Sequence, residues 1–259
     1  MPPAQTAVNR CRLCLQEKKL CDSHIIPEFL YRPIYDPQHR IIQVSGAGRQ
    51  GKHHKKGLRE KLFCRGCEDK FGKLEKYAGD FLYSEAGANA QIGTEEYRDF
   101  IVIRGLDYTK FKLFQMSLIW RAGISSKPEF ANVQLGGRHQ EQLRLMLLKG
   151  DPGEPHQYGC FMIITPTYYE VLEKMMMFAE ERRFSDNRCY MFLLAGLTWI
   201  FVVSSHSGTI PFKEKLFLSK DGTLPIMVED KVSKQYFEKT VAGWQNSGQL
   251  EAVMKKYSK

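Results

Sequence analysis

The sequence predicts an α+β protein in two parts, a metal-stapled finger near the N-terminus followed by a larger α+β region. Two Cys-x-x-Cys pairs lie within the first 70 residues, Cys11 with Cys14 and Cys64 with Cys67. From about residue 97 the chain changes character, and helical apolar patterns alternate with short apolar runs typical of strands. A chain of 259 residues can hold two such parts, and we place the division between residues 1–95 and 96–259.

The paired cysteines predict a structural zinc site. Each pair can direct two thiolates from one tight turn, and four thiolates in a tetrahedral shell form a structural zinc site. The two pairs are separated by 49 residues, so they must meet across a folded insert. The alternative is a set of buried free thiols, because unpaired cysteine is often simply buried. Two matched pairs favour zinc.

The expected elements follow from apolar spacing and from turn residues. In the finger we expect short strands at 20–24 and 40–44, and a helix from Glu68 to about Tyr77 that Gly79 and Asp80 end. Beyond it we expect strands at 100–103, 159–165, 188–194 and 197–204, the last two forming a hairpin. Helices are expected at 108–121, 138–148, 167–181, 231–241 and 249–256. The helix at 108–121 has one apolar stripe, formed by Phe111, Phe114, Leu118 and Ala122.

Composition excludes several classes of protein. No apolar run reaches the roughly 18 residues that a membrane span needs. The N-terminus lacks the apolar core of a secretory signal. Seven cysteines, four of them in Cys-x-x-Cys pairs, suit a metal in a reducing compartment better than a disulfide framework. We therefore expect a cytoplasmic protein without a membrane partner.

The positive charge is concentrated in the finger. The chain has a net charge of +9, and residues 1–80 hold 16 Lys and Arg against 9 Asp and Glu. A glycine-rich loop at 45–57 carries four of these cations, Arg49, Lys52, Lys55 and Lys56. Such a loop can follow a phosphate backbone, so we expect it to bind nucleic acid. The alternative is a basic surface that serves only solubility.

Between the cysteine pairs lies the segment Ser23–Pro27, with the sequence Ser-His-Ile-Ile-Pro. Over roughly residues 8–80 the arrangement resembles the HNH (His-Me finger, ββα-metal) endonuclease superfamily in its zinc-bound treble-clef form. In that family a Cys-x-x-Cys knuckle leads into a strand that ends in Asp-His or Glu-His, followed by two apolar residues and Pro. A second Cys-x-x-Cys then opens a helix. The resemblance implies a treble-clef ββα-metal finger that hydrolyses phosphodiester bonds in nucleic acid, with DNA favoured over RNA.

The resemblance also implies roles for individual residues. His24 would be the general base beside a bound divalent ion. Glu68 stands where the family commonly has His or Asn, and would be a ligand for catalytic Mg²⁺ or Mn²⁺. Glu75, further along the same helix, could reinforce this site. Ser23 replaces the family's acidic residue, and Asp22 should point to the other face of the strand. The family's Asn, which orients the base, has no match.

Two functions therefore remain open. One is a metal-dependent endonuclease with a variant active site. Standalone nucleases of this kind resemble bacterial or phage-defence effectors that often work with a partner protein. The region 96–259 would then gate the enzyme, target it or bind that partner. The other is a catalytically inactive, zinc-stapled module that binds nucleic acid or protein. A thiol oxidoreductase is disfavoured, because neither cysteine pair opens a helix behind a βαβ strand.

Overall fold

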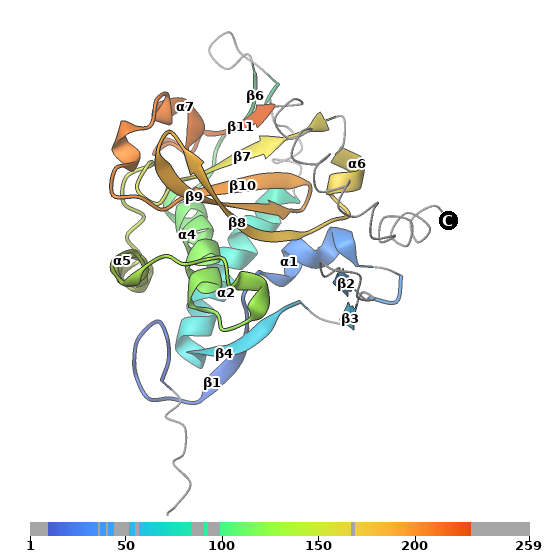
Figure 1. Cartoon of the computed structure of the whole chain (residues 1–259), viewed down its shortest axis with the longest axis vertical. Helices are drawn as coiled ribbons and strands as arrows, with labels where there is room; N and C mark the ends of the chain where they lie inside the picture. Colours follow the sequence, from blue (N-terminus) through green and yellow to red (C-terminus); the bar gives the residue numbers. More distant parts are fainter. Residues whose placement is uncertain are drawn as a thin grey trace, which may run out of the picture.

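The computed structural model describes residues 10–35, 37–39, 41–43, 52–54, 57–83, 91–92, 99–166 and 169–228, and it is α+β as predicted (Figure 1). The helices are α1 (Glu28–Tyr31), α2 (Arg65–Leu82), α4 (Tyr108–Ile124), α5 (Gly137–Lys149), α6 (Tyr169–Leu172) and α7 (Lys213–Leu216), with 3-10 turns η1 (Arg32–Ile34), η3 (Pro128–Phe130) and η5 (Ser207–Thr209). The strands are β1 (Leu20–His24), β2 (Ile41–Gln43), β3 (Lys52–His54), β4 (Arg59–Cys64), β5 (Gln91–Ile92), β6 (Phe100–Ile103), β7 (Cys160–Ile164), β8 (Met177–Phe184), β9 (Asn187–Leu194), β10 (Leu197–Val202) and β11 (Leu224–Val228). Among the described helices, none is both long and apolar enough to cross a membrane.

The N-terminal part is built on two antiparallel strands and one helix. β1 pairs with β4, and His24 at the end of β1 lies opposite Arg59. The backbone N–H of Ile25 donates to Leu58 O at 3.1 Å, so the pairing continues one step beyond the strand. α2 begins directly after β4, because Cys64 is both the last strand residue and the helix N-cap. This order places the end of β1 beside the first turns of α2.

The larger region is organised around a seven-stranded sheet in the order β5-β6-β11-β7-β10-β9-β8. All neighbouring strands are antiparallel except β11 and β7. The hairpin predicted at 188–204 is confirmed as β9 and β10, joined by Ala195 and Gly196 at φ 50° and 77°. Positive φ at both turn residues matches the right-handed twist of a two-residue hairpin.

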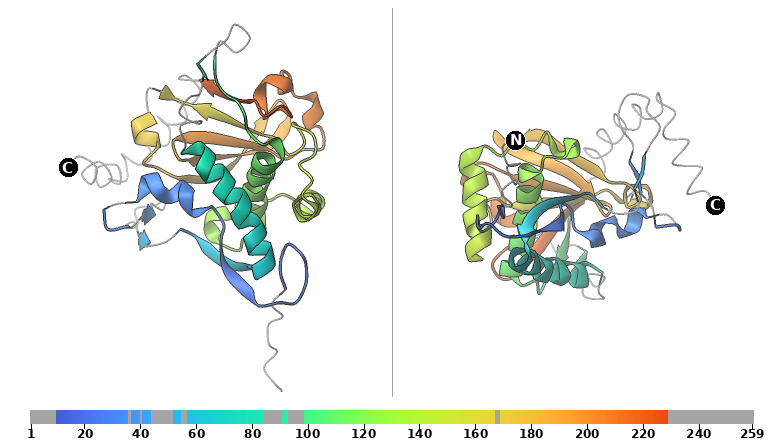
Figure 2. Two further views of the ribbon diagram at one scale, coloured as in Figure 1. Left: turned by 180° about the vertical axis from the view of Figure 1, so that it is seen from behind. Right: turned by 90° about the horizontal axis from the view of Figure 1, so that it is seen from below.

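α4 lies between the finger and this sheet (Figures 1 and 2). The ring of Phe114 packs 5.6 Å from Phe29 of α1 on one side and 6.3 Å from Trp199 of β10 on the other. Trp120 stacks on Phe63 of β4 with 5.7 Å between ring centroids. One apolar core therefore contains described residues from both sides of the predicted boundary, and the division into two domains stays a prediction.

Two predicted elements differ from the structure. The helix expected at 167–181 is wrong, since α6 covers only Tyr169–Leu172 and β8 follows. β8 is a strand because it pairs with β9 through a tight turn in which Ser185 and Asp186 have φ of 44° and 62°.

α2 continues past Gly79, where we expected the helix to end, and it ends at Leu82. A Cβ at Gly79 would lie 3.3 Å from the ring of Phe29, so close packing of α1 on α2 explains this glycine. The helices expected at 231–241 and 249–256 lie outside the described residues.

Candidate metal centre and adjoining polar site

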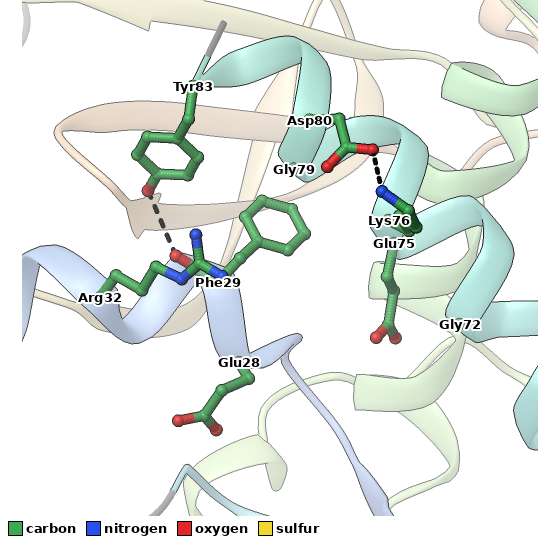
Figure 3. Close-up of a pocket in the computed structure, with 9 residues that line it drawn as sticks. All are labelled: Glu28, Phe29, Arg32, Gly72, Glu75, Lys76, Gly79, Asp80 and Tyr83. Atoms are coloured by element: carbon green, nitrogen blue, oxygen red, sulfur yellow. Dashed lines mark hydrogen bonds and ion pairs between the residues drawn. The ribbon is translucent and has the colours of Figure 1, made fainter.

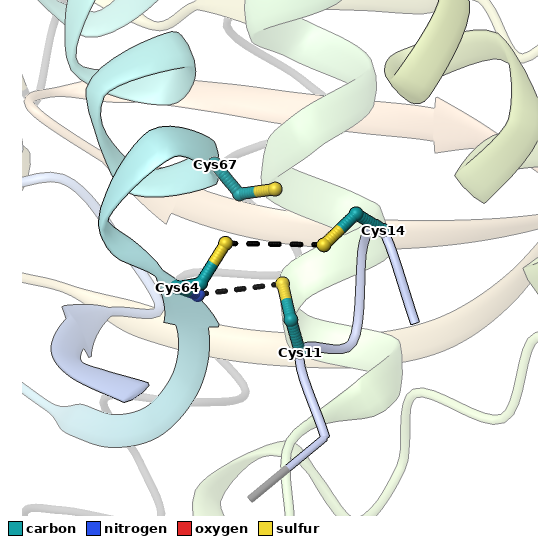
Figure 4. Close-up of side chains that lie close together, drawn as sticks. All are labelled: Cys11, Cys14, Cys64 and Cys67. Carbon is teal, nitrogen blue, oxygen red and sulfur yellow. Dashed lines mark hydrogen bonds between the residues drawn. The ribbon is translucent and has the colours of Figure 1, made fainter. Parts of the chain in front are cut away.

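The structure brings the two cysteine pairs together at one point (Figure 4). The Sγ atoms of Cys11, Cys14, Cys64 and Cys67 all lie within 4.8 Å of one another. The Sγ atoms of Cys14 and Cys64 are 3.8 Å apart, which matches the edge of about 3.8 Å of a tetrahedron with Zn–S bonds of about 2.3 Å. The four thiols therefore form a site that fits zinc.

The backbone around the first pair holds the thiols in place. The N–H of Leu15 donates to Cys11 O at 2.9 Å, which closes a tight turn with Leu15 at φ 61°. The N–H of Arg12 donates to Leu62 O at 2.9 Å and fixes this turn against β4. The N–H of Cys64 donates to Cys11 Sγ at 3.3 Å. Each knuckle is therefore organised by the other.

The pKa values of Cys11, Cys14 and Cys67 are shifted in different directions. Burial opposes ionisation of Cys11, but hydrogen bonds from backbone N–H groups outweigh it and lower the pKa of Cys11 to about 7. Burial raises the pKa of Cys14. Burial and the neighbouring thiols raise the pKa of Cys67. Thiolates this close repel one another, so a divalent cation is the natural partner of the fully ionised set, and zinc binding would release protons.

One helical turn beyond Cys64, α2 meets β1 through a hydrogen bond. Ser23 is fully buried, and its Oγ donates to Glu68 Oε2 at 2.5 Å. Burial raises the pKa of Glu68, although the Ser23 hydrogen bond and the cation of Arg121 act in the opposite direction. Asp22 points to the other face, where its carboxylate lies 4.0 Å from Arg59, as strand alternation predicts.

His24 lies at the same end of β1 and is held by a carboxylate. Its Nε2 is 2.7 Å from Glu28 Oε2, and the imidazole is 16% exposed. Tyr35 Oη donates to the other oxygen of Glu28 at 2.5 Å. Burial and the cation of Arg59 lower the pKa of His24, whereas Glu28 and Glu75 oppose this shift. His24 is therefore largely neutral at pH 7 and can accept a proton.

A buried arginine from α4 reaches this site. The guanidinium of Arg121 is 2% exposed, and its Nη1 lies 2.5 Å from Glu75 Oε1 and 3.0 Å from His24 O. The remaining nitrogens donate to Ser117, with Nε on its carbonyl at 3.2 Å and Nη2 on its hydroxyl at 3.1 Å. Glu75 therefore has a fixed cationic partner.

Two residues of this polar site, Glu28 and Arg121, were not predicted from the sequence. Glu28 had a local signal, because it follows His24 by four residues in the first turn after Pro27. Arg121 is 97 residues from His24 and carries no local signal that links the two. His24 and Glu68 lie on adjoining elements, joined by the contact between Ser23 and Glu68.

Most of the predicted nucleic-acid-binding residues lie outside the described part of the chain. Arg49, Lys55 and Lys56 are in this group. Lys52 opens β3, opposite Gln43 of β2, and its side chain is not described. The role of this loop stays a prediction.

Within the described ranges, the cysteine cluster is the only set of three or more His, Cys, Asp or Glu side chains with ligand atoms at metal-binding distance. Glu68 therefore does not belong to a preassembled ligand set of that size. A cleft of about 630 Å³ lies between α1 and α2 (Figure 3), and Glu68 is not among the residues that line it. We call it the α1–α2 cleft, and its lining residues are Glu28, Phe29, Arg32, Gly72, Glu75, Lys76, Gly79, Asp80 and Tyr83.

The chain was compared with protein-family models, with curated proteins and with solved structures, and none of the three comparisons finds a match.

Proposed function

We propose that this protein is a metal-dependent endonuclease of the HNH type, with a treble-clef ββα-metal finger and a variant active site. The observation that carries the proposal is the hydrogen bond between Ser23 and Glu68. It joins the strand that ends in His24 to the helix that follows the second cysteine pair. The candidate base on β1 and the candidate carboxylate ligand on α2 thereby lie on adjoining elements.

In this proposal His24 is the general base and Glu28 is its positioning residue. A neutral imidazole can take a proton from the water that attacks the phosphorus atom. The Glu28 carboxylate, 2.7 Å from Nε2, orients the ring and stabilises the imidazolium that forms. Nδ1 is then the nitrogen that accepts the proton. Glu28 would supply the orientation that the family obtains from Asn.

The residues present fit a single hard cation with few protein ligands. The Glu68 carboxylate, held by Ser23, would bind Mg²⁺ or Mn²⁺. Magnesium commonly uses only one or two carboxylates together with substrate phosphate oxygens. When bound, such an ion would neutralise charge on the phosphate that is cut. Zinc in the cysteine site would have a purely structural role and contribute to folding.

The basic excess of the finger supports nucleic acid as the substrate, and the resemblance favours DNA. In the same proposal the enzyme is a bacterial or phage-defence effector, and residues 96–259 target it or bind a partner protein. The shared apolar core supports close cooperation of this region with the finger, because α4 contributes Arg121 to the site.

A second candidate is the inactive binding module. Ser23 replaces a carboxylate, and Arg121 already neutralises Glu75. The finger therefore offers a hard cation fewer ligands than the family pattern does. In that case zinc and the basic surface would support binding of nucleic acid or protein without hydrolysis.

Cleavage of plasmid and of single-stranded DNA with Mg²⁺ or Mn²⁺ tests the first candidate. We expect His24→Ala to lower the rate by about 10²–10⁴-fold, the usual contribution of a general base. Glu28→Gln should lower it by about tenfold or more, since it keeps the shape but loses the charge. His206→Ala, which replaces an exposed histidine away from the site, is the matched control.

Zinc content of every variant is measured first, so that loss of the finger is not mistaken for loss of the base. Equal cleavage by the native protein and by His24→Ala would contradict the role of His24. Absence of cleavage, together with salt-dependent DNA binding that His24→Ala leaves unchanged, would favour the binding module.

A further inference from the structure

The α1–α2 cleft lies against the candidate active site (Figure 3). Glu28 lines it from α1 and contacts the imidazole of His24. Glu75 lines it from α2 and contacts Arg121, which also binds His24 O. A molecule in this cleft would therefore approach the groups that position the candidate base.

Gly72 lies on the cleft face of α2. It follows Glu68 by four residues and precedes Glu75 by three, so the three residues share one face of the helix. A Cβ added at Gly72 would meet no heavy atom within 4 Å. Packing therefore does not require glycine here, although glycine in a helix interior is less stable than alanine. The missing side chain leaves this part of the cleft wall free of side-chain atoms.

Two carboxylates of the cleft have cationic partners, Glu75 with Arg121 and Asp80 with Lys76, whereas Glu28 contacts the largely neutral imidazole of His24. Arg32 differs, because no carboxylate of the described residues lies within 4.0 Å of it. Its guanidinium carbon is 6.0 Å from the centre of the Tyr83 ring, and Tyr83 is 49% exposed. A guanidinium beside an exposed aromatic ring is a typical platform for a nucleobase and its phosphate.

We propose that the α1–α2 cleft binds an unpaired segment of the substrate strand next to the scissile phosphate, and that Gly72 keeps the cleft open for it. This inference rests on the proposed function. A volume of about 630 Å³ falls within the range of about 300–1,000 Å³ for small-ligand sites, which suits nucleotides but not a duplex. A duplex would have to open first, at the energetic cost of unstacking.

The test fills the cleft without disturbing the fold. Gly72→Leu places a side chain in the cleft. Gly137→Leu is the matched control, because a Cβ at Gly137 of α5 also meets no heavy atom within 4 Å, and Gly137 neither lines the cleft nor belongs to a cysteine knuckle. Leucine favours helix over glycine, so both variants should melt no lower than the native protein. Tyr83→Leu removes the ring, whereas Tyr83→Phe keeps it.

Binding is measured on the full-length, zinc-loaded protein by fluorescence anisotropy. The probes are a short labelled single-stranded DNA and the same sequence as a blunt duplex, with Ca²⁺ in place of Mg²⁺ to prevent cleavage. We expect Gly72→Leu and Tyr83→Leu to weaken single-strand binding by about tenfold, within the range for loss of one stacked base. Gly137→Leu and Tyr83→Phe should stay close to the native protein.

Single-strand binding that Gly72→Leu leaves unchanged would overturn the inference, as would a preference for the duplex. Plasmid cleavage assayed in parallel separates it from the proposed function. If the native protein cuts DNA and Gly72→Leu cuts with the same KM, the endonuclease stands and the cleft inference fails. If binding depends on Gly72 but nothing is cut, the cleft inference stands and the endonuclease fails. If the native protein binds neither probe, the cleft inference also fails.

Discussion

Replacing Arg121 with methionine should destabilise the folded protein by about 3–5 kcal/mol, the usual cost of breaking a buried ion pair. Methionine keeps an unbranched apolar stem about as long as that of arginine up to Nε, but it removes the charge and all the hydrogen bonds of the guanidinium. The change would leave Glu75 and His24 O without their donor, and both hydrogen bonds to Ser117 would also be lost. Since domains are stable by only about 5–15 kcal/mol, the loss would be easy to measure.

A double-mutant cycle with Glu75→Gln isolates the ion pair. Glu75 is 23% exposed, so water screens part of the interaction and we expect a coupling energy of about 1–3 kcal/mol. Arg121→Met combined with Glu75→Gln should therefore cost less than the sum of the two single changes. Arg65→Met is the matched control. Arg65 forms an exposed ion pair with Asp69 on α2, the helix that also carries Glu75, and this pair should contribute less than about 1 kcal/mol to stability.

The assay is urea denaturation of the zinc-loaded protein at pH 7, followed by circular dichroism and by tryptophan fluorescence. Because Arg121 belongs to α4 and two of its partners, Glu75 and His24, belong to the finger, both probes should report one transition that shifts to lower urea with an unchanged slope. Additive effects in the cycle, or a cost for Arg121→Met no larger than that of Arg65→Met, would refute the reasoning.

The remaining predictions concern two other cations. Burial lowers the pKa of Lys112 from 10.5 to about 7. Between pH 7 and pH 10.5, Lys112 is therefore protonated in the unfolded chain but largely deprotonated in the folded protein. Stability should then rise by about 2 kcal/mol from pH 7 to pH 9, and Lys112→Met should remove this rise in urea titrations across that range. Arg144 donates to Leu13 O at 2.7 Å and places a cation beside Cys14. Arg144→Gln should therefore speed zinc release to a chelator by about tenfold.

Each of these changes has its own control. Lys149→Gln alters an exposed cation on the same helix as Arg144, and it should leave zinc release unchanged. Equal release rates for the two variants would show that Arg144 does not support the cysteine site. For Lys112, an unchanged rise of stability between pH 7 and pH 9 in Lys112→Met would assign that rise to other groups.

The cysteine cluster could be predicted because the spacing within each Cys-x-x-Cys pair is local information. The hydrogen bonds that join the two knuckles, such as that from Cys64 N–H to Cys11 Sγ, depend on the fold and could not be predicted. α2 and the hairpin of β9 and β10 were predicted from local patterns as well. β8 could not be predicted, since the apolar run at Met175–Met177 suits either a helix or a strand. Only pairing with β9 decides between them.

Only some residues of the polar site around His24 could be predicted from the sequence. His24 and Glu68 follow from the resemblance, but the partners that hold them depend on the fold. Glu28 becomes a partner of His24 only because the chain turns at Pro27. The spacing of four residues is compatible with this contact but does not determine it. Arg121 lies near the end of a helix, where a basic residue ordinarily favours the helix dipole and faces water. It is buried because the finger covers it.

α4 shows why a periodic pattern understates such contacts. Its sequence predicts one apolar stripe, yet every residue from Phe111 to Ala122 is buried. In a helix covered on all sides, buried polar side chains are usually hydrogen-bonded, although the amide of Gln115 has no hydrogen-bond partner among the described residues. Lys112 meets Pro155 O at 2.9 Å, and Arg121 meets Glu75 and His24 O. Apolar contacts alone would tolerate sliding of α4 against the finger, whereas the Arg121 hydrogen bonds fix one position and thereby the geometry around His24.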